Sequence, residues 1–202
     1  MNTKILSLLL VLSVGLSFSS CRKEVKKAAA IQYTIEPKTT TINWTAYKTT
    51  DKVPVKGVFN TVNIIKTTTT TNPFEAVNQI EFSIPVNSIN SKNEGRDAKL
   101  INSFFGSMTD TKNIKGKIDL GENGKGNVAI TMNGITANLP ITYTISGQLV
   151  EMDATMNLDN WKAKLAIDAL NKVCNEKHKG KDGISKTWSD VNIHIVSYLK
   201  AQ

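Results

Sequence analysis

Residues that build metal centres and disulfide frameworks are scarce in this sequence. Its 202 residues contain two cysteines, Cys21 and Cys174, and two histidines, His178 and His194. A four-ligand structural zinc site would use nearly all of them, and a disulfide scaffold needs several cysteine pairs. We therefore predict a protein without a metal site or other cofactor and without a disulfide framework.

Familiar catalytic motifs are also missing. The sequence has no Gly-x-Ser-x-Gly elbow, His-Glu-x-x-His pair or glycine-rich phosphate loop. His178 lies in a lysine-rich stretch, and His194 is expected to point outward from a strand. Glu94 and Asp97 flank Arg96 and fit turn and helix-start chemistry better than an acid/base pair. We predict that the protein is not an enzyme, with catalysis on a bound lipid kept as a minor alternative.

Acidic residues are fewer than basic ones, and this would favour a nucleic-acid partner if it stood alone. Lysine and arginine number 25 against 17 aspartates and glutamates, which gives a formal net charge of +8. The hydrophobic fraction of 40% and the charged fraction of 21% are those of an ordinary globular domain. Disordered, collagen-like and polytopic membrane classes are therefore excluded.

The first twenty residues indicate in which compartment this positively charged protein is found. Residues 1–20 carry one positive charge, Lys4, followed by an apolar run over residues 5–16 and then by small residues. This order is typical of a secretory signal peptide, and the run is shorter than the roughly 20 residues of a spanning helix. We predict an exported protein, which argues against nucleic acid as a partner.

Cys21 directly follows the leader. The ending Phe18-Ser19-Ser20-Cys21 resembles a bacterial lipobox, in which the cysteine is lipidated and becomes the first residue of the mature protein. We predict a membrane-anchored lipoprotein facing the periplasm, with residues 21–39 as lipidated N-terminus and flexible tether and residues 40–202 as one folded domain. A plain signal peptide followed by a chance cysteine is the alternative.

Alternation of apolar and polar residues dominates the rest of the chain. A period of two is the signature of half-buried antiparallel strands. About eight such segments occur, and eight strands can close into a barrel just wide enough for one small ligand. We predict an all-β antiparallel barrel, with a sandwich as the alternative. The expected strands cover residues 42–46, 53–66, 80–86, 114–120, 128–132, 139–145, 150–158 and 190–195.

Two segments have helical spacing instead. Residues 96–105 and 159–174 are expected to form short helices that lie over the barrel ends. The stretch from 175 to 188 is basic and polar and is expected to be an exposed loop without core residues. The apolar positions of the second helix that should face the core are Trp161, Leu165, Leu170 and Val173.

The residues expected to face the barrel interior are almost all apolar. A set of this kind either fills a packed core or lines a long apolar cavity in which methionines form adaptable walls. We predict the second outcome, with the packed core as the alternative. The predicted lining residues are Phe59, Ile80, Phe82, Ile84, Phe104, Phe105, Ile118, Ile130, Met132, Ile141, Tyr143, Ile145, Met152, Met156, Ile193 and Ile195.

One stretch of the chain has a family pattern. Residues 86–100 read Val-Asn-Ser-Ile-Asn-Ser-Lys-Asn-Glu-Gly-Arg-Asp-Ala-Lys-Leu and are followed by Phe104-Phe105. This resembles the Ser-Ile-x-Thr, Arg-Asp-x-His-Leu and aromatic-pair pattern of the YceI-like family of bacterial envelope proteins. Residues 44–46, 55–59 and 132–136 resemble further family segments, in the same order along the chain.

The resemblance implies a fold and a function. It implies an extended, lipocalin-like antiparallel barrel that holds a polyisoprenoid chain noncovalently, with quinones or prenyl phosphates as ligands. We therefore expect carriage or storage of an isoprenoid-like or other long-chain lipid in the envelope. A ligand-free interaction or stress-associated module with a packed barrel is the alternative. Arg96 and Lys99 are candidates for contact with the headgroup. For Arg96 we favour a surface salt bridge with Asp97, which would fix the loop to the helix, over direct contact with a headgroup. A homodimer is left open.

Overall fold

The computed structural model describes residues 29–202. The predicted signal peptide and Cys21 lie outside these residues, so both remain predictions. Within the described part, no helix combines the length and the apolar character needed to cross a membrane.

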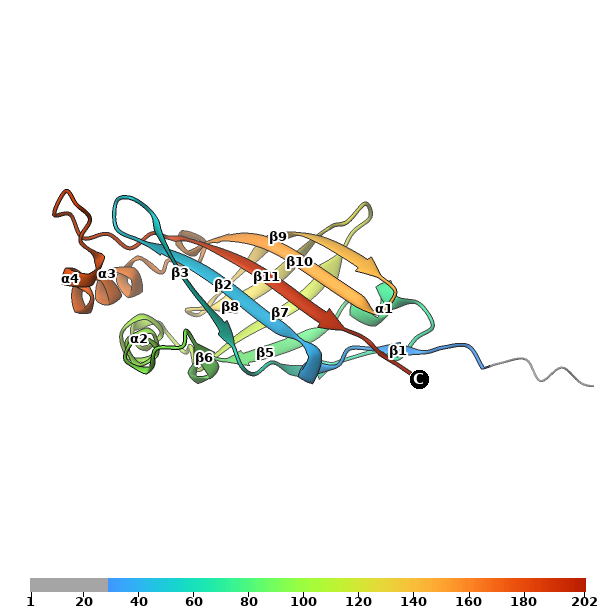
Figure 1. Cartoon of the computed structure of the whole chain (residues 1–202). Helices are drawn as coiled ribbons and strands as arrows, with labels where there is room; N and C mark the ends of the chain where they lie inside the picture. The colour runs from blue at the N-terminus through green and yellow to red at the C-terminus, as the bar shows by residue number, and fades with distance from the viewer. Residues whose placement is uncertain (1–28) are drawn as a thin grey trace, which may run out of the picture.

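A strongly curled antiparallel sheet of ten strands forms the body of the domain (Figure 1). Its strands follow the order β4-β5-β7-β8-β9-β10-β11-β2-β3-β6, so that most neighbours in the sheet are also neighbours in the chain. The all-β, lipocalin-like fold predicted from alternation and family resemblance is confirmed. The strands are β2 (Thr41–Lys48), β3 (Val53–Phe59), β4 (Asn63–Lys66), β5 (Glu81–Pro85), β6 (Ile89–Asn90), β7 (Asn113–Leu120), β8 (Lys125–Met132), β9 (Ile135–Ser146), β10 (Leu149–Asn157) and β11 (Asp190–Tyr198).

The curled sheet has two more strands than the eight predicted. The long strand expected over residues 53–66 is interrupted after Phe59, so β3 pairs with β2 while β4 pairs with β5. The short β6 adds the second extra strand by pairing with the end of β3. In the described residues β4 and β6 end the sheet without pairing with each other, so the curled sheet is not closed into a full ring of hydrogen bonds.

The folded domain begins before residue 40. Residues 33–39 were assigned to the tether, but Tyr33–Thr34 forms β1 and pairs with β12 (Lys200–Ala201) next to the C-terminus. Pro37–Thr39 forms the 3-10 turn η1, and Ile35 packs against the core. These residues carry apolar side chains that can be buried at the end of the sheet, which a polar tether lacks.

Short helices cover both ends of the curled sheet. Figure 1 shows α2, α3 and α4 gathered at one end, and α1 at the other end near the C-terminus. The two helical regions expected from spacing are present. Helix α1 was not predicted, and α4 lies in the stretch 175–188 that was expected to be a loop. The helical segments are α1 (Pro73–Val77), η2 (Val86–Ser88), α2 (Glu94–Lys99), η3 (Leu100–Phe104), η4 (Phe105–Ser107), η5 (Leu158–Trp161), α3 (Lys164–Val173) and α4 (Asn175–His178).

The buried face of α3 differs from the predicted one. Leu165 is 76% exposed and Val173 is 46% exposed, whereas Ala166, Ile167 and Leu170 are buried. The predicted face assumed one helix over residues 159–174. A left-handed residue at position 162 separates η5 from α3 and changes the rotational phase of the helix that follows.

Helix α2 is fixed by polar side chains at its start. Asn93 caps it, because its Oδ1 accepts a hydrogen bond from the N–H of Arg96 at 2.8 Å. Asp97 accepts hydrogen bonds from both the N–H (3.0 Å) and the hydroxyl (2.5 Å) of Ser91, which is buried. The expected Arg96–Asp97 salt bridge is absent among the described residues, since Asp97 turns toward the loop that precedes the helix.

Candidate functional site

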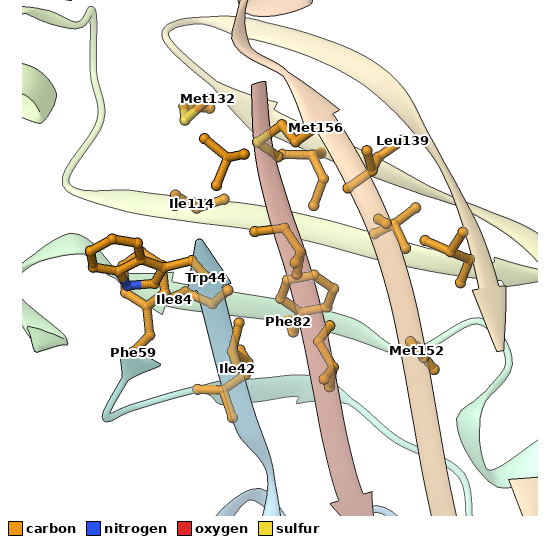
Figure 2. Close-up of a pocket in the computed structure, with 18 of the residues that line it drawn as sticks. Ile42, Trp44, Phe59, Phe82, Ile84, Ile114, Met132, Leu139, Met152 and Met156 are labelled. Atoms are coloured by element: carbon orange, nitrogen blue, oxygen red, sulfur yellow. The ribbon is translucent and has the colours of Figure 1, made fainter. Parts of the chain in front are cut away.

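An apolar cavity of about 200 Å³ runs inside the curled sheet. Figure 2 shows side chains from strands that lie across the cavity from each other pointing into the same space. On one side are Ile42 and Trp44, and on the other are Leu139, Met152 and Met156. Inward positions alternate with outward ones along each strand, so the sequence period of two builds the wall directly. The side chains that this cavity offers to a ligand are almost all apolar.

Most of the predicted lining residues do lie around this cavity. Their position is established by the structure, and their contact with a ligand remains a prediction. They are Phe59, Ile80, Phe82, Ile84, Phe104, Phe105, Ile118, Ile130, Met132, Ile141, Met152, Met156, Ile193 and Ile195.

Tyr143 and Ile145 were predicted to line the cavity and do not. The Tyr143 hydroxyl donates a hydrogen bond to the carbonyl of Gly121 at 2.7 Å, and its ring lies 6.4 Å from that of Phe74 in α1. Both residues are half-buried against the core near the end of β9. Period two assigns a face of the strand, but it cannot tell how far along that face the cavity extends.

Polar atoms at the cavity wall are already paired within the protein. The hydroxyls of Thr40 and Ser197 lie 2.7 Å apart, and Thr40 also donates to the carbonyl of Glu36 at 3.0 Å. The indole N–H of Trp44 donates to the carbonyl of Val58 at 3.3 Å. The interior therefore offers a ligand apolar contact and few hydrogen bonds.

Glycines make room for the large aromatic side chains of the wall. Gly116 on β7 lies opposite Phe82 on β5, and a Cβ at Gly116 would overlap the phenyl ring. Gly57 has the same relationship to Trp44. These glycines therefore let the two rings lie against the backbone of the neighbouring strand.

At the end of the cavity covered by α2, α3 and α4, four residues that were absent from the predicted lining contribute to the wall. Ile167 and Leu170 of α3 line it, together with Thr187 and Trp188 from the segment predicted to be an exposed loop. The Trp188 indole N–H donates to the carbonyl of Thr49 at 2.7 Å. A tryptophan within a basic polar stretch was the available signal, because such a residue is seldom placed fully in solvent.

His178 lies behind this end of the cavity and is half-buried. Its Nδ1 is 2.7 Å from the hydroxyl of Thr187 and 3.2 Å from Oδ1 of Asn171. Burial, together with the smaller effect of the positive charges on Lys48 and Lys99, lowers the pKa of His178 to about 4. At neutral pH the ring is therefore uncharged.

Arg96 and Lys99 both lie on α2 at this end of the molecule. Neither belongs to the cavity lining, but Leu100, the residue after Lys99, does. Lys99 is also close enough to act on the charge of His178. Their predicted contact with a headgroup remains a prediction.

His194 points outward, as expected from alternation, and pairs with Asp153 on the neighbouring strand at 2.8 Å. Within the described residues, no group of three or more His, Cys, Asp or Glu side chains could hold a metal ion. Cys174 is a buried free thiol.

A single antiparallel sheet curled around an apolar cavity, with short helices at its ends, defines a lipocalin-like domain. A family model described as the YceI-like domain matches residues 33–195. The chain belongs to the YceI-like family, as the resemblance of residues 86–105 had indicated.

Two solved structures resemble the fold. One is a polyisoprenoid binding domain from Saccharophagus degradans implicated in plant cell wall breakdown, at 12% identity and a TM-score of 0.58, covering 86% of this chain and 99% of that one. The other is BcnA of Burkholderia cenocepacia, at 14% identity and a TM-score of 0.52, covering 82% and 99%. The match covers almost the whole of both solved chains. No curated protein sequence matches the chain.

Proposed function

We propose that this protein binds an isoprenoid-like or other long-chain lipid noncovalently inside the curled sheet. The observation that carries the proposal is the apolar cavity, whose few polar wall atoms are paired within the protein. The structural relative named as a polyisoprenoid binding domain supports this choice of ligand class. The almost wholly apolar lining fits binding better than catalysis, because acid/base chemistry needs titratable groups at the reacting atoms.

Burial of the chain supplies the driving force. Each methylene removed from water contributes about 0.8 kcal/mol before ordering costs are subtracted. The cavity of about 200 Å³ is smaller than the roughly 300–1,000 Å³ typical of drug-sized ligand pockets. A long chain must therefore widen it, and the thioether side chains of Met132, Met152 and Met156 are suited to such movement.

We further propose that the domain operates in the bacterial envelope, anchored by lipid on Cys21 after removal of residues 1–20. The leader composition and the position of the cysteine support this location. An anchored carrier would keep the apolar cavity close to the membrane that supplies its ligand.

The alternative function is an interaction module with a packed interior and no ligand. The small volume of the cavity is the observation in its favour.

Lipid extraction and titration distinguish these two functions. The domain, purified as residues 22–202, is extracted with organic solvent for mass spectrometry, then delipidated and titrated with prenyl alcohols while tryptophan fluorescence is recorded. Co-purifying lipid or saturable binding is expected. The complete absence of both would overturn lipid binding and leave the packed module.

Two neighbouring substitutions on β7 provide a matched control. Ile118 faces the cavity, whereas Lys117 is exposed on the outer face. Ile118→Trp fills cavity space and is expected to weaken prenyl-alcohol binding at least about tenfold, whereas Lys117→Trp adds the same ring outside and should leave binding unchanged. Equal loss in both variants would place the ligand outside this cavity.

A further inference from the structure

The sheet divides between β9 and β10. Their pairing ends at Thr142 and Asp153. Beyond these residues β9 remains paired with β8 as far as Ile135, and β10 remains paired with β11 as far as Asn157. The two strands therefore separate in the middle of the sheet while each keeps its other neighbour.

Proline accounts for the place of separation. The N–H of Tyr143 donates to the carbonyl of Gly124 on the β8 side at 2.8 Å, so by alternation the N–H of Thr142 faces β10. The next hydrogen-bonded pair with β10 would join Pro140 to Thr155. Pro140 has no N–H to donate, so the ladder stops one step before it.

We call the gap between Pro140–Thr142 and Asp153–Thr155 the fork. In front of it, on the outer face of the sheet, lies a groove of about 910 Å³. This groove and the inner cavity have part of their walls in common at the fork. The residues that line both are Ile141, Asp153, Ala154 and Ile193.

The outer groove is polar, in contrast to the cavity behind it. Its charged residues are Asp119, Glu122 and Asp153 against Lys125, with His194 beside Asp153, so acidic groups predominate. Like charges disfavour a phosphate in this groove, whereas amide and hydroxyl side chains suit a hydroxylated group. The groove residues with amide or hydroxyl side chains are Asn43, Thr45, Asn127, Thr142, Thr155 and Asn192.

We propose that the fork is a lateral portal, through which a lipid tail enters the cavity while its neutral, hydroxyl-bearing head stays in the outer groove. The inference rests on the proposed function and adds the route of entry and the class of head. Polyprenyl alcohols and quinols have this chemistry, and prenyl phosphates do not.

Two alanines of similar burial allow the portal to be tested. Ala154 lies at the fork and lines both the outer groove and the cavity, whereas Ala46 on β2 lines the cavity alone. Each Ala→Phe substitution removes similar cavity volume, but only Ala154→Phe obstructs the fork. Geranylgeraniol is mixed with each delipidated protein in a stopped-flow instrument, and uptake is followed by the fluorescence of Trp44 and Trp188 at the cavity wall.

Ala154→Phe is expected to slow association at least about tenfold relative to Ala46→Phe. Ala154→Leu, a smaller obstruction, should give an intermediate rate and guards against misfolding of the larger variant. Equal association rates in the two phenylalanine variants would overturn the portal and place entry at an end of the sheet. If the unsubstituted protein binds no geranylgeraniol at all, the proposed function fails instead.

Geranylgeranyl diphosphate tests the head class, because it carries the same tail. It is expected to bind at least about tenfold more weakly than geranylgeraniol at low salt, where charge repulsion is least screened. Equal or tighter binding of the diphosphate would overturn the assignment of the head to the acidic groove.

Discussion

Gly57 lies directly opposite Trp44 in the β2–β3 pair, and a Cβ at Gly57 would overlap the indole ring. The same Cβ would also come within 2.7 Å of the carbonyl of Asn90. Only glycine therefore allows the Trp44 ring, which is buried and lines the cavity, to lie across the neighbouring strand.

Gly57→Ala is expected to destabilise the domain by about 1–3 kcal/mol, because the added methyl group must displace the buried ring. Urea unfolding measures the change. Gly95→Ala in α2 is the matched control: its new Cβ has its nearest neighbour at 3.6 Å, and alanine should stabilise the helix by up to about 1 kcal/mol. In a Trp44→Leu background the cost of Gly57→Ala should fall, and an unchanged cost would contradict the steric account.

Two leucines of α3 are predicted to differ sharply. Leu170 is buried against the cavity end, whereas Leu165 is 76% exposed. Leu170→Ala should cost about 2–5 kcal/mol of unfolding free energy, and Leu165→Ala should stay within about 0.5 kcal/mol. Thermal or urea unfolding of the two variants checks this. Similar losses would mean that α3 packs through the face predicted from sequence spacing.

The stability of the loop before α2 should depend strongly on Asp97 and very little on Arg96. Asp97→Ala leaves the N–H and the hydroxyl of buried Ser91 without their acceptor. The expected cost is about 1–3 kcal/mol. Arg96→Ala should cost less than about 0.5 kcal/mol, since no ion pair of Arg96 occurs in the part of the chain described. A large effect of Arg96→Ala would restore the salt-bridge interpretation.

Stability should fall as the pH drops from about 6.5 to 4. The pKa of His178 is lowered to about 4 in the folded protein, while an unfolded histidine has its ordinary value near 6.5. In this window the unfolded chain binds the proton and the folded chain does not, so acid favours unfolding. Because His178 is only half-buried, its contribution is of the order of 1 kcal/mol.

Histidine NMR signals provide the measurement, since the chain has only two histidines. The His178 ring should remain neutral down to about pH 4. Lys99→Gln removes one of the positive charges that act on the ring, so the His178 pKa should rise. Titration of His178 near its ordinary value in the unsubstituted protein would contradict the burial that the structure shows.

Lipidation can be tested on the full chain in its host envelope. Cys21→Ser removes the only thiol that the lipobox-like sequence could modify. The substituted protein should lose incorporation of labelled fatty acid and move from the membrane fraction to the soluble fraction. Cys174→Ser, at a buried thiol, is the control and should stay in the membrane fraction. Unchanged membrane association of Cys21→Ser would argue for a plain signal peptide.

Alternation alone determined much of this protein. Because successive strand residues face opposite sides, the runs around Ile84, Ile118 and Met152 were sufficient to predict the antiparallel fold and most of the cavity wall. The Arg96-Asp97 segment with its aromatic pair indicated the family that the matched domain model then established.

Only the tertiary structure decided the features that require contact between segments far apart in the sequence. The contribution of Trp188 to the cavity needs the contact with Thr49, which lies far away in the sequence. Tyr143 leaves the wall because its strand extends beyond the cavity toward α1. The fork needs both the missing N–H of Pro140 and the particular register of β9 against β10, and register is a property of paired strands that neither strand carries alone.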